Sequence, residues 1–223
     1  MLLYLHKKKG PPVLREGIGA FTDMIKNIVF DMGGVLIDYN PEKNLASLEP
    51  DVREIAIREI FRNNLWSEKD RGTVSAEEIW ELKGGLIPDE SRERVKSMVM
   101  NLYPYMPPFP DMPGLVARLR KKGYGIFLLS NASLDFYENK KNIPALELFD
   151  GYIVSADYQL IKPEPGIYEK LREKFGLNLG ECVFIDDVQE NVQAAVAAGM
   201  QALRFEGSIE KLENQLRELG VNI

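Results

Sequence analysis

Cysteine and histidine are almost absent from this sequence. Cys182 and His6 are the only residues of their types among 223. A lone cysteine cannot form a disulfide within the chain, so the fold needs no oxidising compartment, and we expect Cys182 to be a buried filler rather than a nucleophile. His6 lies ahead of the regular apolar pattern, which argues against catalysis by histidine.

Long apolar runs and a surplus of basic charge are missing as well. No apolar stretch approaches the ~20 residues of a membrane span. The chain has 28 Lys+Arg against 34 Asp+Glu and a pI of about 5.1, which leaves no basic excess to neutralise nucleic-acid phosphates. We therefore expect a cytoplasmic monomer or homodimer that binds neither membranes nor nucleic acid.

Short, almost wholly apolar runs alternate with amphipathic helical patterns from Asn27 onward. This alternation indicates a parallel sheet covered on both faces. Within the long helical stretch over residues 41–102, Ser75 and Glu78 form a capping-box pattern that predicts the start of a helix. The predicted strands occupy residues 27–31, 124–130, 151–155, 182–187 and, more weakly, 201–205.

The pattern predicts an α/β protein with an open, parallel, Rossmann-like core and a helical cap inserted after the first strand. The core comprises residues 27–38 and 107–223, and the cap comprises residues 39–106. Residues 1–26 look unlike the rest and are expected to be a loose N-terminal extension. The prolines of residues 103–110 predict a stiff connection between the parts. We expect a hinged cap over a site at the sheet edge, with a rigid helical decoration as the alternative.

Polar residues follow the predicted strands at the points where the strands end. In open parallel sheets, ligands bind outside the carboxyl ends of the strands, so the topology brings these residues to one edge. Each alone could be structural, because an Asp after a strand is a common helix N-cap and the others fit ordinary turns. Their joint occurrence is harder to explain in this way. The residues are Asp31, Ser130 with Asn131, Lys162, and Asp186 with Asp187.

This set of groups suits phosphoryl transfer through a covalent intermediate. Asp31 can attack phosphorus and form an acyl phosphate, which divides one difficult step into two easier ones. Three crowded carboxylates repel one another and a phosphate dianion, and Mg²⁺, which prefers oxygen ligands, resolves both problems. Lys162 would place positive charge beside the phosphoryl group and keep Asp31 ionised. Ser130 and Asn131 would donate hydrogen bonds to the phosphoryl oxygens.

Four segments carry this pattern in a fixed order along the chain. They are Phe30-Asp31-Met32-Gly33-Gly34-Val35-Leu36, Leu128-Leu129-Ser130-Asn131, Lys162-Pro163-Glu164-Pro165-Gly166-Ile167-Tyr168, and Val183-Phe184-Ile185-Asp186-Asp187. The segments resemble the motifs of the haloacid dehalogenase (HAD) superfamily of hydrolases, over roughly residues 27–205. The resemblance is greatest to the branch with a helical cap after the first strand. That branch includes sugar-phosphate phosphatases and the phosphatase domain of soluble epoxide hydrolase.

The resemblance implies a Mg²⁺-dependent phosphatase of small phosphomonoesters, among them sugar phosphates, so the partner would be a small phosphorylated metabolite. It implies that Asp31 is the nucleophile. It also implies that the backbone carbonyl of Gly33 and the carboxylate of Asp187 join Asp31 as metal ligands, with Asp186 as an outer or alternative ligand. The cap would select the leaving group. The residues implied to hold the phosphoryl group are Ser130, Asn131 and Lys162.

One position departs from the phosphatase pattern. Phosphatases of this superfamily usually carry a second Asp two residues after the nucleophile, which protonates the leaving oxygen and then activates water. Here Gly33 stands at that position. General acid–base catalysis contributes ~10²- to 10⁴-fold, so its loss predicts a slow enzyme rather than an inactive one. A cap residue or an ordered water could substitute, or the substrate could have a good leaving group.

Two other functions stay open. A non-catalytic or vestigial protein would bind phosphorylated ligands at the same site without turnover. A 2-haloacid dehalogenase also lacks the second Asp and needs no metal. However, Asp186 and Asp187 beside the nucleophile would repel the carboxylate of a haloacid, so the sequence favours the phosphatase.

Residues 66–75 lie between helical patterns of the predicted cap and are interpreted as a loop. Within this segment we expect Arg71 to be solvated, and contact with a substrate phosphate is the alternative. Trp66 and Trp80 fall in apolar patterns, so we expect them in the cap core rather than against a ligand.

Overall fold

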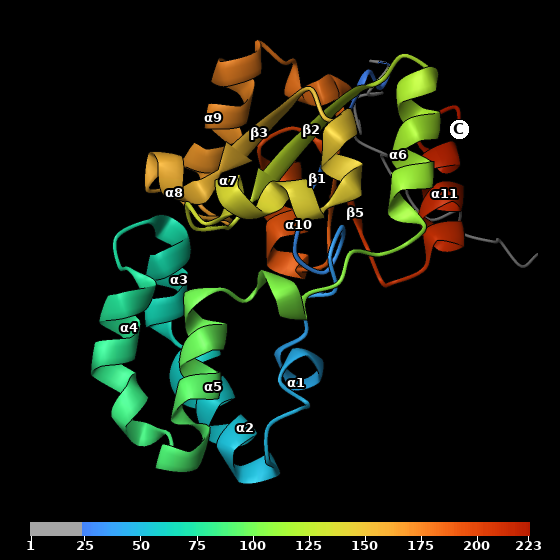
Figure 1. Ribbon diagram of the computed structural model, residues 1–223. Coiled ribbons are helices and arrows are strands. Elements are labelled where there is room, and N and C mark those ends of the chain that lie inside the picture. Colours follow the sequence, from blue (N-terminus) through green and yellow to red (C-terminus); the bar gives the residue numbers. More distant parts are fainter. Residues whose placement is uncertain (1–23) are drawn as a thin grey trace, which may run out of the picture.

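The computed structural model describes residues 24–223, in which five parallel strands form one open sheet in the order β3-β2-β1-β4-β5 (Figure 1). This confirms the predicted α/β architecture, although each strand is one residue shorter than expected. Residues 1–23 of the expected N-terminal extension lie outside the described range. The strands are β1 (Asn27–Phe30), β2 (Gly125–Ser130), β3 (Gly151–Val154), β4 (Cys182–Asp186) and β5 (Gln201–Arg204).

Helices cover both faces of the sheet, because successive side chains of a strand point to opposite faces. Ile28 and Phe30 of β1 join a buried cluster with α6 (Met112–Lys121) and α11 (Ile209–Glu218). Val29 points the other way, into a cluster with α9 (Pro165–Phe175) and α10 (Gln189–Ala197). Figure 1 shows these two helix pairs on opposite sides of the sheet.

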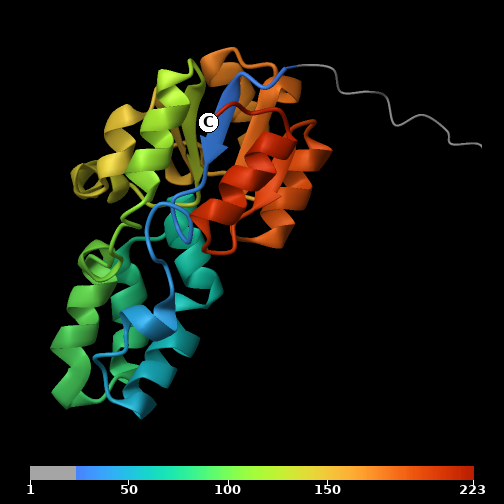
Figure 2. The ribbon, with the colours of Figure 1, turned by 90° about the vertical axis from the view of Figure 1, so that its right-hand side faces the viewer.

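Between β1 and α6 the chain forms a helical lobe beside the sheet (Figures 1 and 2). The predicted capping box is present at the start of α4, where the Ser75 hydroxyl accepts from the Glu78 N–H and the Glu78 carboxylate accepts from the Ser75 N–H. The helices of the lobe are α1 (Pro41–Asn44), α2 (Pro50–Ala56), which continues as one π-helical turn over Ile57–Phe61, α3 (Asn64–Arg71), α4 (Ala76–Lys83) and α5 (Asp89–Met100).

Short helical elements complete the chain. Two of them, α7 (Phe136–Asn139) and α8 (Ser155–Tyr158), follow β2 and β3 on the side of the sheet that faces the helical lobe (Figure 1). None of the helices within residues 24–223 combines the length and the apolar character needed to cross a membrane. The single 3₁₀ turns are Gly84–Leu86, Tyr103–Tyr105, Lys140–Asn142, Pro144–Leu148 and Leu179–Glu181.

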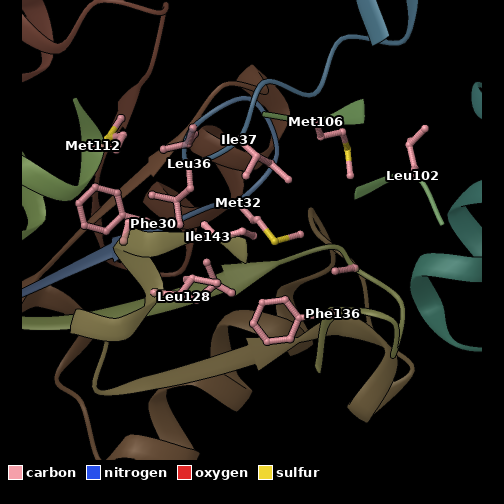
Figure 3. Close-up of a cluster of buried hydrophobic side chains, with 14 of the residues drawn as sticks. Phe30, Met32, Leu36, Ile37, Leu102, Met106, Met112, Leu128, Phe136 and Ile143 are labelled. Carbon is pink, nitrogen blue, oxygen red and sulfur yellow. The ribbon is translucent and has the colours of Figure 1, made fainter. Parts of the chain in front are cut away.

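The two crossings between sheet and helical lobe lie side by side. The Asp38 N–H donates to the Pro107 carbonyl, and the Phe109 N–H donates to the Leu36 carbonyl, both at 2.9 Å. Buried side chains continue across this neck, from Phe30 and Met32 to Leu102 and Met106 (Figure 3). The apolar core of the sheet therefore extends into the helical lobe without a break.

Candidate active site

The strand ends bring three predicted residues to one edge of the sheet. Phe30, the last residue of β1, pairs with both β2 and β4. Asp31 therefore leaves the sheet between Ser130 and Asp186, which end the two flanking strands. The Asp31 N–H donates to the Ile185 carbonyl at 2.8 Å, so a hydrogen bond fixes its backbone.

Lys162 reaches this edge from the loop between α8 and α9. Its Nζ lies 2.7 Å from Oδ1 of Asp31 and donates to Oδ2 of Asp186 at 2.6 Å. The side chain is 1% exposed. Burial lowers the pKa of Lys162, but the two carboxylates raise it more, so that the pKa lies above its usual value. Lys162 is therefore a buried, charged ammonium between two carboxylates.

Asn131 holds the backbone of the loop that carries Lys162. The Asn131 Nδ2 donates to the Lys162 carbonyl at 3.0 Å, and the Asn131 Oδ1 accepts from the Lys162 N–H at 2.7 Å. One amide N–H of Asn131 is used in this way, and the second is left for a ligand.

The carboxylates at this edge are crowded. Oxygen atoms of Asp31, Asp186 and Asp187 all lie within 4.8 Å of one another. Burial and the charges of Asp186 and Asp187 together raise the pKa of Asp31 to about 7, although the Lys162 charge lowers it. Burial and the Asp186 charge also raise the pKa of Asp187. When all three carboxylates are ionised, they and one ammonium leave two negative charges, which fits a divalent cation.

The protein already saturates one of the three acidic residues. Asp186 is fully buried, and its oxygens accept from Lys162, from the amide of Asn191 at 3.1 Å and from the Val188 N–H at 2.8 Å. Asp31 and Asp187 line the cavity at the sheet edge, whereas Asp186 lies behind them. The oxygens free for a ligand therefore belong to Asp31 and Asp187.

Ser130 has a buried hydroxyl without a hydrogen-bond partner in the part of the chain that the structure describes. The residue is 1% exposed, and it ends β2 beside Asp31. A buried polar group without a partner costs free energy, so such groups are usually satisfied by a ligand or a water. Within residues 24–223 the Ser130 hydroxyl therefore lacks a partner at the sheet edge, although Ser130 is not among the residues that line the cavity beside Asp31.

Two glycines follow Asp31, and each lies close to another side chain. Gly33 lines the cavity, and a Cβ on it would stand 3.4 Å from the Cβ of Tyr39. Gly34 has φ +71°, and a Cβ there would lie 2.3 Å from a carboxylate oxygen of Asp187. Any larger residue at position 34 would therefore displace the Asp187 carboxylate.

A cavity of about 240 Å³ lies between the sheet edge and the helical lobe. Its floor contains the predicted residues Asp31, Gly33, Asn131, Lys162 and Asp187. Figure 3 shows Met32, Ile37, Leu102 and Met106 from its apolar wall. The other side chains that line it, which the sequence analysis did not assign to the site, are Tyr39, Trp66, Lys69, Asp70, Tyr103, Ala132, Ser133, Asp135, Val188 and Asn191.

The loop interpretation of residues 66–75 is wrong for its first half. α3 runs to Arg71, and only residues 72–75 connect it to α4. Trp66, expected in the cap core, is 8% exposed and lines the cavity, although it also packs on Phe61.

Arg71 neither contacts a ligand site nor stands in solvent. Its guanidinium binds both carboxylate oxygens of Glu164, at 2.7 and 3.0 Å, and it donates to the carbonyl of Gln159 at 3.1 Å. Glu164 lies two residues after Lys162, so this ion pair joins the end of α3 to the loop that carries the site lysine. The pairing of Arg71 depends on how α3 packs against the sheet domain, which a local pattern does not reveal.

The pattern of haloacid dehalogenase-like hydrolases matches residues 25–199. The chain belongs to this family. It is 26% identical to a sesquiterpene phosphatase of Aspergillus oryzae, over 82% of this chain and 91% of that protein. It is also 26% identical to D-ribitol-5-phosphate phosphatase of Bacteroides thetaiotaomicron, over 84% of this chain and 95% of that protein. These findings confirm the resemblance drawn from the four motifs.

Solved structures share the fold of this HAD-like hydrolase. A HAD family enzyme of Bacteroides thetaiotaomicron in complex with magnesium and inorganic phosphate has a TM-score of 0.63 at 20% identity, covering 84% of this chain and 98% of that chain. L-2-haloacid dehalogenase of Xanthobacter autotrophicus with chloropropionic acid covalently bound also has a TM-score of 0.63, at 22% identity, covering 90% and 85%. Phosphatases and dehalogenases thus share this fold, and the choice between them depends on the site.

Proposed function

We propose that this HAD-like hydrolase is a Mg²⁺-dependent phosphatase of small phosphomonoesters that works through an aspartyl-phosphate on Asp31. The observation that carries the proposal is the charge pattern of the site. Oxygens of Asp31, Asp186 and Asp187 lie within 4.8 Å of one another, whereas only one buried ammonium, that of Lys162, pairs with Asp31 and Asp186, and the excess negative charge suits a divalent cation. The Mg²⁺–phosphate complex of the Bacteroides enzyme of the same fold supports the proposal.

The proposed metal ligands are Asp31, the backbone carbonyl of Gly33, and Asp187, with Asp186 in the outer position that its saturated oxygens favour. Bound Mg²⁺ would supply the positive charge that lets a phosphate dianion enter a pocket of carboxylates.

The protein's own groups then act on the phosphoryl group. An oxygen of Asp31 attacks phosphorus, while the Lys162 ammonium neutralises charge on the phosphoryl oxygens. The Ser130 hydroxyl, which otherwise lacks a partner, and the free amide N–H of Asn131 donate hydrogen bonds to those oxygens. We assign the cap, predicted over residues 39–106, the selection of the leaving group.

Metal removal tests the proposal most directly. We expect chelator-treated protein to release p-nitrophenol from p-nitrophenyl phosphate at least ~10³-fold more slowly than Mg²⁺-loaded protein, because the Lys162 ammonium offsets only one of the three carboxylate charges. Added Mg²⁺ should restore the rate and raise the melting temperature, since an ion that binds only the folded state stabilises it. Equal rates with and without metal would refute the proposal.

Two further measurements, of phosphate binding and of chloride release, distinguish the two other functions. A vestigial phosphate-binding protein would show Mg²⁺-dependent binding of inorganic phosphate by calorimetry but no p-nitrophenol release. A dehalogenase would release chloride from 2-chloropropionate in the presence of chelator. The acidic residues Asp186 and Asp187 argue against the dehalogenase, because two further carboxylates at the nucleophile repel the carboxylate of a haloacid.

The cavity wall favours a leaving group with an apolar part. The apolar residues Ile37, Trp66, Leu102 and Met106 line the cavity together with its carboxylates. Burial of each CH₂ contributes ~0.8 kcal/mol, so a few methylene groups against this wall are worth 10- to 100-fold in affinity. The similarity to a sesquiterpene phosphatase agrees with this preference, whereas the expected sugar phosphates would leave the wall unused.

A substrate panel checks this preference. We expect kcat/KM for geranyl phosphate to exceed that for ribose 5-phosphate by at least ~10-fold, because only the prenyl chain buries apolar surface against the wall. Trp66→Ala should reduce the difference. A preference for the sugar phosphate would show that the leaving group avoids this wall.

A further inference from the structure

The position that usually supplies the acid and base of a HAD phosphatase has no side chain here, because Gly33 stands there. Another carboxyl group lines the same cavity from the opposite side. It belongs to Asp70, the penultimate residue of α3 in the helical lobe. We propose that Asp70 is the catalytic acid and base, delivered by the cap in place of the missing residue. This inference rests on the proposed phosphatase function.

The backbone of Asp70 is anchored to the sheet domain. The Ser155 hydroxyl of α8 donates to the Asp70 carbonyl. The ammonium of the preceding residue, Lys69, donates to Ser133 Oγ and Asp135 Oδ2, both at 2.7 Å. The following residue, Arg71, forms an ion pair with Glu164. Figure 1 shows the end of α3 beneath α8. Three consecutive residues of α3 in the helical lobe are thus bound to segments that follow the strands of the sheet.

Gly72 allows this close approach. It ends α3 with φ +83°, and a Cβ on it would lie 3.0 Å from both the Cβ and the carbonyl oxygen of Ala156. The end of α3 can therefore pack directly against α8, and this contact fixes the position of Asp70 in the cavity wall.

The surroundings of the Asp70 carboxyl suit an acid that exchanges protons near neutral pH. The carboxyl forms no hydrogen bond or ion pair within residues 24–223, so its proton is not committed to another group. Burial raises its pKa to about 7; the charges of Lys69 and Lys162 lower it, and those of Asp31 and Asp135 raise it. Tyr39 and Tyr103 line the same cavity.

The position of Asp70 on the helical-lobe side of the cavity is suited to protonation of the leaving oxygen. In phosphoryl transfer the attacking and leaving oxygens lie roughly in line, on opposite sides of phosphorus. With Asp31 attacking from the sheet edge, the leaving oxygen points towards the helical lobe. Asp70 enters from that side, so its carboxyl can reach the leaving oxygen without passing the phosphoryl group.

The other polar groups of the cavity are less suited to the role. Asp135 is the ion-pair partner of Lys69, and the Lys69 ammonium is shared with Ser133. Burial raises the pKa of the Tyr39 and Tyr103 phenols above their already high ordinary values, so neither phenol exchanges its proton easily.

The two half-reactions balance with Asp70 as the only proton carrier. In the first, the Asp31 carboxylate bonds to phosphorus, the bond from phosphorus to the ester oxygen breaks, and the Asp70 carboxyl gives that oxygen its proton. In the second, the Asp70 carboxylate takes a proton from a water whose oxygen attacks phosphorus. The bond to Asp31 then breaks, inorganic phosphate leaves, and Asp70 is protonated again.

Asp70→Asn tests the role through the dependence on the leaving group. With an alkyl phosphate, whose alkoxide leaves poorly, we expect kcat to fall ~10²- to 10⁴-fold. With p-nitrophenyl phosphate the first step needs no acid, but hydrolysis of the aspartyl-phosphate still needs the base. We therefore expect a rapid burst of about one p-nitrophenolate per chain, followed by slow turnover.

Controls separate this role from a structural one. Glu77→Gln removes an exposed carboxylate from α4 of the same lobe and should change neither rate. Asp70→Asn should melt no lower than the parent protein, because it replaces a carboxylate whose ionised form is disfavoured by burial. Equal loss of both activities without a burst, or no loss at all, would overturn the assignment of Asp70. An inactive parent protein would instead refute the phosphatase function itself.

Discussion

Replacement of Asp31 by Asn is expected to lower turnover of every phosphomonoester by at least ~10⁴-fold, because the amide cannot act as a nucleophile towards phosphorus. The substitution keeps the size of the side chain and the packing of β1 around it. Trapping with radiolabelled substrate should show a phosphorylated parent protein and no label on the Asp31→Asn variant. Label at another residue would show that the nucleophile lies elsewhere.

Stability measurements show whether the Asp31→Asn variant loses activity while it remains folded. Burial raises the pKa of Asp31 to about 7, above the unfolded value of 3.8, so its ionisation disfavours the folded state as the pH rises from about 4 towards 7. The Asn variant avoids this cost. We therefore expect its melting temperature in metal-free buffer at pH 7 to be no lower than that of the parent, with a smaller increase on addition of Mg²⁺.

Replacement of Lys162 by Met is expected to destabilise the metal-free protein by ~3–5 kcal/mol, because it leaves the buried carboxylates of Asp31 and Asp186 without their shared cation. The methionine side chain fills nearly the same volume, so packing contributes little. Urea unfolding at pH 8 measures the loss. At pH 5 the loss should be smaller, since the Asp31 carboxylate, whose pKa is raised to about 7, becomes neutral by protonation as the pH falls.

Two further variants check the cause of this loss. Lys170→Met removes an exposed lysine that pairs with Glu173 on the surface of α9, and it should destabilise the protein far less than Lys162→Met, because solvent screens an exposed ion pair. Adding Asp186→Asn to Lys162→Met should recover part of the stability, because one of the unpaired charges is removed. If Lys162→Met and Lys170→Met cost the same, the buried ion pairs do not contribute as argued.

The strand-end residues could be located from the sequence because their positions follow from topology. Apolar runs followed by Asp31, Ser130 and Asp186 predict parallel strands, and the carboxyl ends of parallel strands meet at one edge. No knowledge of side-chain packing is needed for this step. Asn131 shows the limit of such reasoning, since its amide supports the Lys162 backbone as well as facing the cavity.

The cap side of the cavity could not be derived in the same way. Residues 66–75 read as a loop, yet α3 continues to Arg71, and its end is held by ion pairs and a hydrogen bond to residues 60 or more positions away. A local pattern carries no information about such partners. Lys69 and Asp70 are charged residues that a helical pattern assigns to solvent, and only the packing of α3 against α8 turns them towards the cavity.

The sequence by itself determined the family, the parallel sheet and the acidic edge with its lysine, because each depends on short segments whose geometry is set by the backbone of a strand and the turn after it. The tertiary structure alone decided which residues face Asp31 from the helical lobe. That choice depends on the contact between two elements far apart in the chain, where Gly72 permits an approach that a larger residue would strain.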